Sequence, residues 1–373
     1  MHLRADLHIH SPFALAVSKH MLPEQLLASS KIKGIQIIGT GDGLHPTWRS
    51  LWSEHLVNPE GVCVVPTAEV EGLHRVHHLI LMEDFDQCVA LYELLKPYSS
   101  NIDRNGRPHV RLEGEEIAAH VHAVGGMIGP AHAFTPWTSL YATYDHVRDC
   151  YGDEPIDLLE LGLSADSSYG AGINELYQVP FISNSDAHSP QTNKFGREFN
   201  LLDVTDLTPR AVLSAIRENR ILMNAGFFPE EGKYNRTACI EGLHQYTREE
   251  AIAHHWRCPV DGARIKKGVA DRARELTDGL PSPRPPYLHL IPLSEIIQRV
   301  LGTASPSVKK VQRLYNEYIS LFGDEITVLI ETPEQEISEI NPAVGAAVQA
   351  LREGRVQLHP GGGGIYGSFS FIQ

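Results

Sequence analysis

"ADLHIHS", residues 5–11, alternates aliphatic residues with two histidines almost at the start of the sequence. In an extended strand, successive side chains point to opposite faces, so His8 and His10 share one face while Leu7 and Ile9 share the other. This pattern fits either a half-buried strand with solvated histidines or one part of a metal site. A metal site needs further ligands elsewhere in the chain, so the remaining sequence decides between the two.

The composition is that of a globular protein with more than one folding unit. The chain has 373 residues, of which 42% are hydrophobic and 21% are charged. It contains no apolar run of about 18 residues, so we expect no membrane contact, and its start lacks the pattern of a secretory signal. The odd count of cysteines, without disulfide-like spacing, predicts a reducing, cytoplasmic location; the cysteines are Cys63, Cys88, Cys150, Cys239 and Cys258.

The order of the predicted elements divides the chain into three units. Residues 1–225 alternate short apolar strands with helices, which predicts parallel β-α units and an α/β fold with a closed or nearly closed barrel. Residues 226–284 form a small insert that begins with a loop-like stretch rich in Gly, Pro and charge. Residues 285–373 are mainly helical, with one short strand expected at "EITVLI" (325–330) and a flexible glycine loop in the tail "HPGGGG".

The charge of the chain is unevenly distributed. The formal net charge of −14 argues against indiscriminate binding to nucleic acid, which depends on neutralising phosphates. From Gly232 to Asn316, however, 14 Lys and Arg residues outnumber 8 Asp and Glu residues. An acidic body with a basic segment is compatible with metal chemistry in one part and phosphate contact in another.

Candidate metal ligands follow the predicted strands of the first unit. In an α/β barrel, functional side chains sit at the carboxyl ends of the strands. Nine residues fit this rule, all of them His, Asp or Glu: His8, His10, Asp42, His45, Glu69, His77, His132, Asp186 and His188. Glu71 and His78 lie next to two of these residues and are alternatives to Glu69 and His77.

The donor set indicates a particular chemistry. Imidazole nitrogen and carboxylate oxygen suit Zn, Mn or Fe, and oxygen donors also suit Mg. Nine ligands with one bridging carboxylate are enough for two or three divalent ions. Clustered ions stabilise the attacking and leaving oxygens when a phosphate ester is hydrolysed. The sequence therefore predicts a metal-dependent phosphoesterase.

The ordered set of motifs resembles the polymerase and histidinol phosphatase (PHP) superfamily, with an N-terminal HxH, a strand-end Glu and a terminal DxH. The resemblance implies a distorted seven-stranded (β/α) barrel with a trinuclear metal centre. Its catalytic residues would be His8, His10, Asp42, His132, Asp186 and His188.

The resemblance also implies how the ligands are shared. The first ion would be held by His8, His10, Glu69 and Asp186. The second would be held by Asp42, His45 and His188, although the superfamily usually has an adjacent Asp-His pair where this chain has "DGLH". Glu69 would bridge to a third ion bound by His77 and His132.

Further stretches resemble one family within this superfamily, endonuclease Q. They include "PAHAFTPW", "SNSDAHSP" followed by "GREFN", "FFPEEGKY" and "IKKGV", and several of them lie outside the candidate metal site. The resemblance implies cleavage of DNA on the 5′ side of deaminated bases (hypoxanthine, uracil, xanthine) or abasic sites, a DNA repair activity. Reading such a lesion requires that the base be extruded into a pocket, and damaged pairs open at lower cost.

The insert departs from the pattern of that family, which has two cysteine pairs with zinc-ribbon spacing. Gly242 and Asp261 stand where the second and fourth cysteines belong, which leaves Cys239 and Cys258. Two thiolates do not make a tetrahedral structural site. We expect that the zinc is lost and that packing around Tyr246 and Trp256 holds this degenerate ribbon; alternatively, one further ligand joins the two cysteines, from among Asp261, His244, His254 and His255.

Several residues are candidates for contact with DNA. Basic residues of the insert would reach phosphates or would simply be solvated: Arg257, Arg264, Lys266, Lys267, Arg272 and Arg274. Phe134 and Trp137 would either stack on a base or pack at the rim of the site. Glu160 would either orient a ligand histidine or make a buried polar contact.

Two other functions compete with the DNA endonuclease. A PHP phosphatase acting on a small phosphate monoester would use the same barrel, but it leaves the basic insert and the helical unit unexplained. A DNA-binding scaffold with a relic barrel is disfavoured because every class of metal ligand is present in residues 1–190.

Overall fold

A six-stranded mixed sheet organises the first part of the chain. The computed structural model describes residues 1–56, 58 and 60–372. In this sheet β1, β2 and β3 run parallel, as the sequence predicts, whereas β9 is antiparallel to both β1 and β10. The order is β13 (Tyr287–His289), β10 (Ile221–Gly226), β9 (Phe199–Asp203), β1 (His2–Asp6), β2 (Ile37–Gly39) and β3 (Cys63–Val65).

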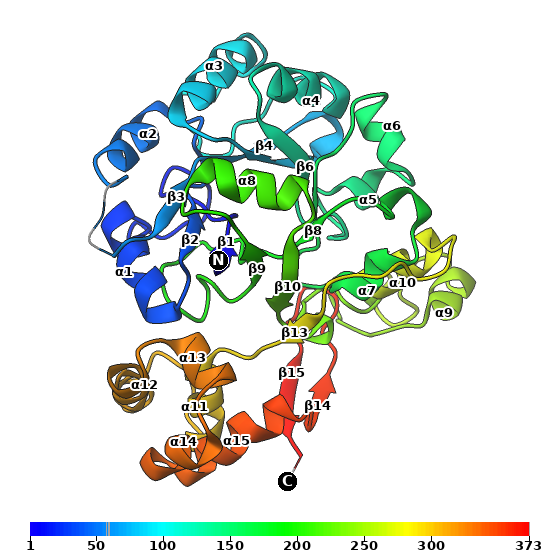
Figure 1. Cartoon of the computed structure of the whole chain (residues 1–373). Helices are drawn as coiled ribbons and strands as arrows, with labels where there is room; N and C mark the ends of the chain where they lie inside the picture. The colour runs from blue at the N-terminus through cyan, green and yellow to red at the C-terminus, as the bar shows by residue number, and fades with distance from the viewer. Residues whose placement is uncertain (57, 59, 373) are drawn as a thin grey trace.

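Two smaller sheets complete the α/β fold of this part. One is antiparallel and contains β4 (Thr67–Glu71), β5 (His77–Leu81) and β6 (Met127–Pro130). The other is parallel and contains β7 (Leu159–Glu160) and β8 (Phe181–Ile182). Figure 1 shows these strands around the centre of the first part of the molecule, so the arrangement resembles a barrel. The count of seven barrel strands stays a prediction.

Helices lie outside these strands, and α8 lies across the end that faces the viewer in Figure 1. Local signals set their bounds. Gly34 ends the first helix with a left-handed φ of 91°, and the Asp84 side chain caps the third helix by accepting from the Gln87 amide. The helices are α1 (Pro23–Lys33), α2 (Pro46–Ser53), α3 (Phe85–Leu95), α4 (Gly114–Ala123), α5 (Leu140–Thr143), α6 (Val147–Tyr151), α7 (Ser167–Ala171) and α8 (Pro209–Arg217).

The insert is a small unit with its own apolar cluster. It contains β11 (Ala238–Cys239), α9 (Arg248–Ala253), β12 (Ile265–Lys266) and α10 (Val269–Leu276), and β11 pairs antiparallel with β12. Tyr246 and Trp256 pack against the buried cluster, as the sequence predicts. The members of the cluster are Cys239, Ala251, Cys258 and Ile265.

The last part of the chain is helical, and it corrects one prediction. Residues 325–330, expected to form a strand, form helix α13, whose N-terminus is capped by the Asp324 side chain. A short apolar run has no periodicity that separates a strand from a buried helix, and here the cap decides the outcome. The helices are α11 (Leu293–Leu301), α12 (Lys309–Phe322), α13 (Glu325–Ile330), α14 (Glu334–Ile340) and α15 (Pro342–Arg352).

A hairpin of β14 (Val356–His359) and β15 (Ser368–Phe371) follows these helices. Its connection, residues 360–367, is the glycine loop that the sequence predicts to be flexible. Backbone hydrogen bonds connect the loop to residues 230–236: Gly361 donates to Glu230, Gly364 donates to Lys233, and Gly367 donates to Glu231 at 2.8–3.0 Å. The flexibility of the loop stays a prediction.

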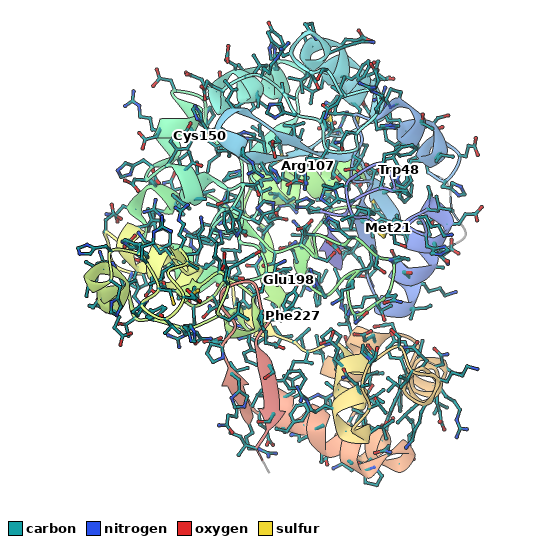
Figure 2. All side chains as sticks on the ribbon, turned by 180° about the vertical axis from the view of Figure 1, so that it is seen from behind. Met21, Trp48, Arg107, Cys150, Glu198 and Phe227 are labelled. Carbon is teal, nitrogen blue, oxygen red and sulfur yellow. The ribbon has the colours of Figure 1, made fainter. Side chains whose placement is uncertain are left out.

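One apolar core joins the first part of the chain to the C-terminal helices. It contains Ile9, Trp48 and Trp52 on one side and Tyr318 and Ile326 on the other, all fully buried. Burial of each large apolar side chain contributes about 1.5–3 kcal/mol, so the two parts stabilise each other. Figure 2 labels Trp48, which belongs to the first part of the chain. No helix of the described residues has the length and apolar character needed to cross a membrane.

Candidate metal centre

The end of β1 and the loop after β8 bring four predicted ligands together. Ile9 forms a parallel bridge with Ala187, and the His10 amide donates to the Ala187 carbonyl at 3.1 Å. This register places Asp186 beside His10, with 3.1 Å between Asp186 Oδ1 and His10 Nε2. The rings of His10 and His188 lie 4.7 Å apart. Residues far apart in sequence therefore form one side of the centre.

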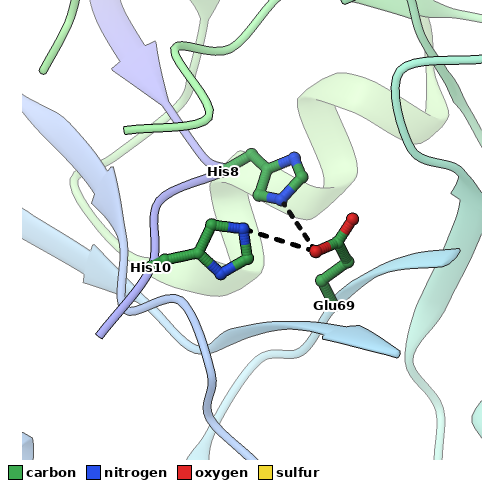
Figure 3. Close-up of side chains that lie close together, drawn as sticks. All are labelled: His8, His10 and Glu69. Atoms are coloured by element: carbon green, nitrogen blue, oxygen red, sulfur yellow. Dashed lines mark ion pairs between the residues drawn. The ribbon is translucent and has the colours of Figure 1, made fainter. Parts of the chain in front are cut away.

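Strands β4 and β5 and the loop after β6 supply the other side. Glu69 Oε1 lies 2.7 Å from His77 Nδ1 and 3.0 Å from His132 Nε2. Glu69 Oε2 lies 3.8 Å from His8 Nε2 and 3.3 Å from His10 Nε2, as Figure 3 shows. The two oxygens of one carboxylate thus face two groups of histidines, which is the geometry of a bridging ligand.

The neighbouring pair Glu71 and His78 is placed differently. His78 points away from the centre and hydrogen-bonds the Tyr151 hydroxyl at 2.7 Å, and burial lowers the pKa of His78 to about 3. Glu71 contacts the outer ring nitrogen of His77 at 3.1 Å. The structure therefore brings Glu69 and His77, rather than Glu71 and His78, to the centre.

Two carboxylates lie behind the first two histidines. Glu160 accepts from His8 Nδ1 at 2.9–3.0 Å, so of the two roles open to it the structure assigns the orienting one. Asp42, predicted as a metal ligand, accepts from His10 Nδ1 at 3.1 Å and from the Ser11 amide at 2.7 Å. Such partners fix the orientation of a ligand ring. In this structure both carboxylates hold imidazoles so that Nε2 faces the centre.

His45 lies outside the centre. Its Nδ1 accepts from the Trp48 amide at 3.3 Å and caps the N-terminus of α2, while its ring stacks on Phe13 with 3.9 Å between centroids. Two residues separate Asp42 from His45 in "DGLH", and they carry His45 to the start of the helix. In this position His45 does not face the centre, and its predicted role as a metal ligand is not supported by the structure.

Charge inside the centre favours ionised carboxylates. Burial would raise the pKa of Glu69, but the imidazole of His77 and the neighbouring histidines hold it well below its usual range. Burial likewise opposes ionisation of Asp186, yet the imidazole of His10, followed by that of His8, lowers its pKa. Arg107 adds a further cation, with Nη1 3.0 Å from Glu69 Oε2, and Figure 2 labels it near the middle of the first part. No motif in the sequence singled out Arg107.

Three residues of the site have left-handed backbones. The φ angles are 49° at Asp42, 34° at His132 and 46° at Asp186. For residues other than glycine this conformation costs of order 1 kcal/mol each and persists where the surroundings enforce it. The fold therefore holds these side chains at an energetic cost.

The donor atoms fit divalent metal ions. His8 Nε2, His10 Nε2 and Asp186 Oδ1 are buried and have no hydrogen-bond partner among the described residues. Within each of three groups the donor atoms lie within 4.8 Å of one another; the groups are His8, His10 and Glu69; His10, Asp186 and His188; and Glu69, His77 and His132. Buried nitrogen and oxygen atoms without partners are what transition-metal ions require.

A cavity of about 650 Å³ opens onto these groups. Its wall contains four of the predicted ligands, His77, His132, Asp186 and His188. It also contains five basic residues that sequence analysis did not select, namely Arg75, Arg107, Lys194, Arg197 and Lys233. They come from four segments of the chain, since Lys194 and Arg197 share the loop between β8 and β9, and their convergence is a property of the fold. We call this hollow the metal cavity.

In the insert, Asp261 joins the two cysteines. The Cys239 thiol donates to Asp261 Oδ2 at 3.1 Å, and Cys258 Sγ lies 3.1 Å from the Tyr246 hydroxyl. A side chain at Gly242 would place its Cβ 2.2 Å from Asp261 Oδ2, so the carboxylate fills the space of the missing cysteine. Among the described residues, this group of three donors contains none of His244, His254 and His255.

The two aromatic candidates for DNA contact differ in placement. Phe134 is 1% exposed and stacks on Tyr141 with 5.2 Å between centroids, so it belongs to the core and the expected stacking on a base is not possible in this position. Trp137 is 39% exposed, and Lys266 Nζ lies 3.9 Å from the centre of its ring. Only Trp137 is therefore available to DNA.

The basic candidates of the insert divide into two sets. Arg272 donates to the Tyr141 and Tyr144 carbonyls at 2.8 Å, and Lys267 pairs with Glu275, so both serve the packing of the insert. The others are exposed or half-exposed: Arg257, Arg264, Lys266 and Arg274.

Comparison with known proteins finds relatives that match parts of the chain. Residues 292–355 match the family model of the MJ0043 C-terminal domain. The chain is 42% identical to the uncharacterized protein MJ0043 of Methanocaldococcus jannaschii over 268 residues, 70% of this chain and 34% of that protein, so it spans about a third of that curated relative.

Two solved structures resemble the chain over its full length. The first is the lesion-specific endonuclease PfuEndoQ from Pyrococcus furiosus, with a TM-score of 0.95, 43% identity, and coverage of 100% of this chain and 96% of that chain. The second is endonuclease Q in complex with a 27-mer duplex substrate that has an abasic lesion at the active site, with a TM-score of 0.96, 43% identity and coverage of 100% and 97%.

Proposed function

Because the chain belongs to the endonuclease Q family of the PHP superfamily, we propose that it is a metal-dependent DNA endonuclease. It hydrolyses the phosphodiester on the 5′ side of a deaminated base (hypoxanthine, uracil or xanthine) or an abasic site. The observation that carries this proposal is the convergence of His, Asp and Glu side chains on one cavity in a chain similar over its whole length to a lesion-specific endonuclease.

The proposed cofactors are two or three divalent ions, Zn, Mn, Mg or Fe, held by the three donor groups that share His10 and Glu69. When bound, such ions stabilise charge on the attacking and leaving oxygens of the phosphodiester. The protein's own residues hold the donors in place: Glu160 and Asp42 orient His8 and His10, and Arg107 balances the charge of Glu69.

The metal cavity suits a nucleotide taken out of the duplex. Its volume of about 650 Å³ lies within the range of small-molecule sites. The basic residues of its wall, Arg75, Lys194, Arg197 and Lys233, favour a phosphodiester substrate. A phosphatase for a small monoester would have no need of the insert beside this cavity.

We also propose a separate role for each unit predicted from the sequence. Residues 1–225 carry out the hydrolysis, residues 226–284 contact DNA, and residues 285–373 stabilise the fold. The insert keeps its fold without zinc, since thiol, carboxylate and hydroxyl groups satisfy one another around Cys239 and Cys258. The free cysteines support a reducing compartment, the cytoplasm, as its location.

The proposal is tested with end-labelled duplexes that contain one hypoxanthine, uracil or abasic site, incubated with Mn²⁺, Mg²⁺ or Zn²⁺. We expect one incision on the 5′ side of the lesion, none in an undamaged duplex, and none by Asp186→Asn or His8→Ala, which should retain DNA binding. Hydrolysis of p-nitrophenyl phosphate without incision of any duplex would overturn the endonuclease in favour of a phosphatase.

A further inference from the structure

Three aromatic and two cationic side chains lie next to one another along the surface beside the metal cavity. Lys233 Nζ lies 5.6 Å from the ring centre of Tyr366 and 5.2 Å from that of Tyr234. The Tyr234 ring lies 6.4 Å from Trp137, over which Lys266 Nζ is placed at 3.9 Å. We call Tyr366, Lys233, Tyr234, Trp137 and Lys266 the aromatic–cation row.

The row connects two hollows. Lys233, Tyr234 and Tyr366 belong to the wall of the metal cavity, which also contains Asp186. At the other end, Lys266 lines a second hollow of about 460 Å³. That hollow, between the insert and the loop before α5, also contains Arg264, Lys267 and Arg272. A chain of nucleotides leaving the metal cavity along the row would arrive at Lys266 and the exposed Arg264.

The row is assembled from separate segments. Tyr366 lies on the glycine loop, which three backbone hydrogen bonds fasten to residues 230–236. Lys266 lies on β12 of the insert, and Trp137 lies in the loop after β6. A fastened loop holds Tyr366 in place although 51% of it is exposed, and Trp137 is 39% exposed. Exposed aromatic rings contribute little to folding, so the rings of Tyr366 and Trp137 are free to contact a ligand.

The chemistry of the row selects unpaired nucleotides. Aromatic rings stack on bases, and lysines between them reach the phosphates that connect those bases. In an intact duplex the faces of a base are covered by its neighbours, so only nucleotides released from the stack offer free faces. A protein partner would need an apolar surface, whereas two of the five members of this row are cations.

We propose that the aromatic–cation row binds the unpaired nucleotides next to the lesion in the strand to be cut, with bases on Tyr366 and Trp137 and phosphates at Lys233 and Lys266. This inference rests on the proposed function and extends it, because it assigns a binding site for the opened strand outside the metal centre. It also assigns a role to the glycine loop.

The test measures binding of two fluorescein-labelled single strands of equal length by anisotropy, with a chelator present so that neither is cut. One is a thymidine oligonucleotide, and the other has the same phosphates without bases. We expect Tyr366→Ala and Trp137→Ala each to weaken binding of the thymidine strand about tenfold, since stacking contributes this much per base, and to leave binding of the base-free strand unchanged.

Controls separate stacking from folding and from activity. Tyr366→Phe keeps the ring and should bind like the parent, as should Tyr177→Ala, which removes an exposed tyrosine that lies outside both hollows. Quenching of Trp137 fluorescence by the thymidine strand, read as the difference between the parent and Trp137→Phe, tests the contact without loss of an aromatic ring.

Equal loss of affinity for both strands, or affinity within twofold of the parent for the thymidine strand, would overturn the row as a stacking site. The incision assay of the parent protein on damaged duplexes is a separate readout. Incision together with unchanged binding by the variants would reject the row alone, whereas selective loss of thymidine binding without any incision by the parent would reject the endonuclease and keep the row.

Discussion

Glu160 holds His8 through both carboxylate oxygens and also accepts from the His132 amide at 2.9 Å and from the Asn184 side chain at 2.8 Å. A single buried carboxylate therefore fixes one donor ring and the backbone of another donor. The orientation of the metal-binding imidazoles therefore depends on the residues that contact their other ring nitrogen, and not on the donor residues alone.

We expect Glu160→Gln to weaken divalent metal binding by about 10–100-fold, because the amide no longer matches the Nδ1–H of His8 and the ring is less well oriented. Isothermal titration with Zn²⁺ or Mn²⁺ measures the loss. Glu175→Gln, which changes a carboxylate bound to Tyr141 instead, is the matched control and should bind metal like the parent. Unchanged affinity of Glu160→Gln would show that the ring needs no such partner.

The buried carboxyl of Glu231 should make the stability of the protein depend on pH. Burial, and then the charge of Glu295, raise its pKa to about 8 in the folded state. A raised pKa means that the folded state holds a proton that the unfolded state releases above about pH 4.5, so stability is full at low pH and falls as pH rises towards 8. In this range the free energy of unfolding should fall by up to about 1.4 kcal/mol per pH unit.

Glu231→Gln removes this titration, so its stability relative to the parent should increase between pH 5.5 and pH 8. Urea unfolding at both values measures the difference. If the free energy of unfolding had the same pH dependence in both proteins across this range, the raised pKa of Glu231 would be contradicted.

At the scale of elements, the helix caps and strand registers explain which residues reach the centre. That His8 and His10 act together just after β1 could be predicted, because side chains two residues apart in an extended segment share a face. The choice of Glu69 and His77 over Glu71 and His78 could not, because it depends on the pairing of β4 with β5. The placement of His45 could not, because it depends on where α2 begins. The burial of Phe134 and the backbone hydrogen bonds of the glycine loop could not be predicted for a related reason: both arise from contacts with segments distant in sequence.

His45→Ala should destabilise the protein by about 1 kcal/mol, since it removes the cap of α2, and it should also lose the stacking on Phe13. Thermal unfolding measures this effect. Metal content, measured by elemental analysis, should equal that of the parent, and His45→Asn should recover much of the stability because asparagine also caps helices. Loss of one ion per chain in His45→Ala would instead support the ligand role predicted from the sequence.

The insert offers a second test at this scale. The double variant Cys239→Ala, Cys258→Ala should contain as much zinc as the parent, because Asp261 and the two thiols give only three donors and the unit is held by packing. Elemental analysis of both proteins makes the comparison. A deficit of one zinc per chain in the variant would refute a metal-free insert.

At the scale of the whole molecule, a buried ion pair joins the first part to the C-terminal helices. Lys33 Nζ lies 2.7 Å from Glu325 Oε1, and Glu325 also accepts from the Tyr315 hydroxyl and from the Leu293 amide. Lys33 and Glu325 are at most 3% exposed. The ion pair lies beside the apolar core that both parts share, so the site and its support unfold together.

We expect Glu325→Ala to destabilise the protein by about 3–5 kcal/mol, because it leaves the Lys33 charge buried without a partner. The double variant Lys33→Met, Glu325→Leu should be much less affected, since it removes both charges. Urea unfolding of the two variants provides the measurement, with Arg148→Ala, which breaks an exposed ion pair, as control. Equal losses in the single and double variants would argue against a cost of unpaired charge.

The left-handed backbones at Asp42, His132 and Asp186 have a consequence for the history of such chains. Selection for thermal stability alone would favour glycine at all three positions, since glycine adopts these φ angles without strain. Descendants that abandoned nucleic acid cleavage are therefore expected to drift towards glycine there. In a related sequence, glycine at any of these three positions would therefore identify a protein that no longer cleaves nucleic acid.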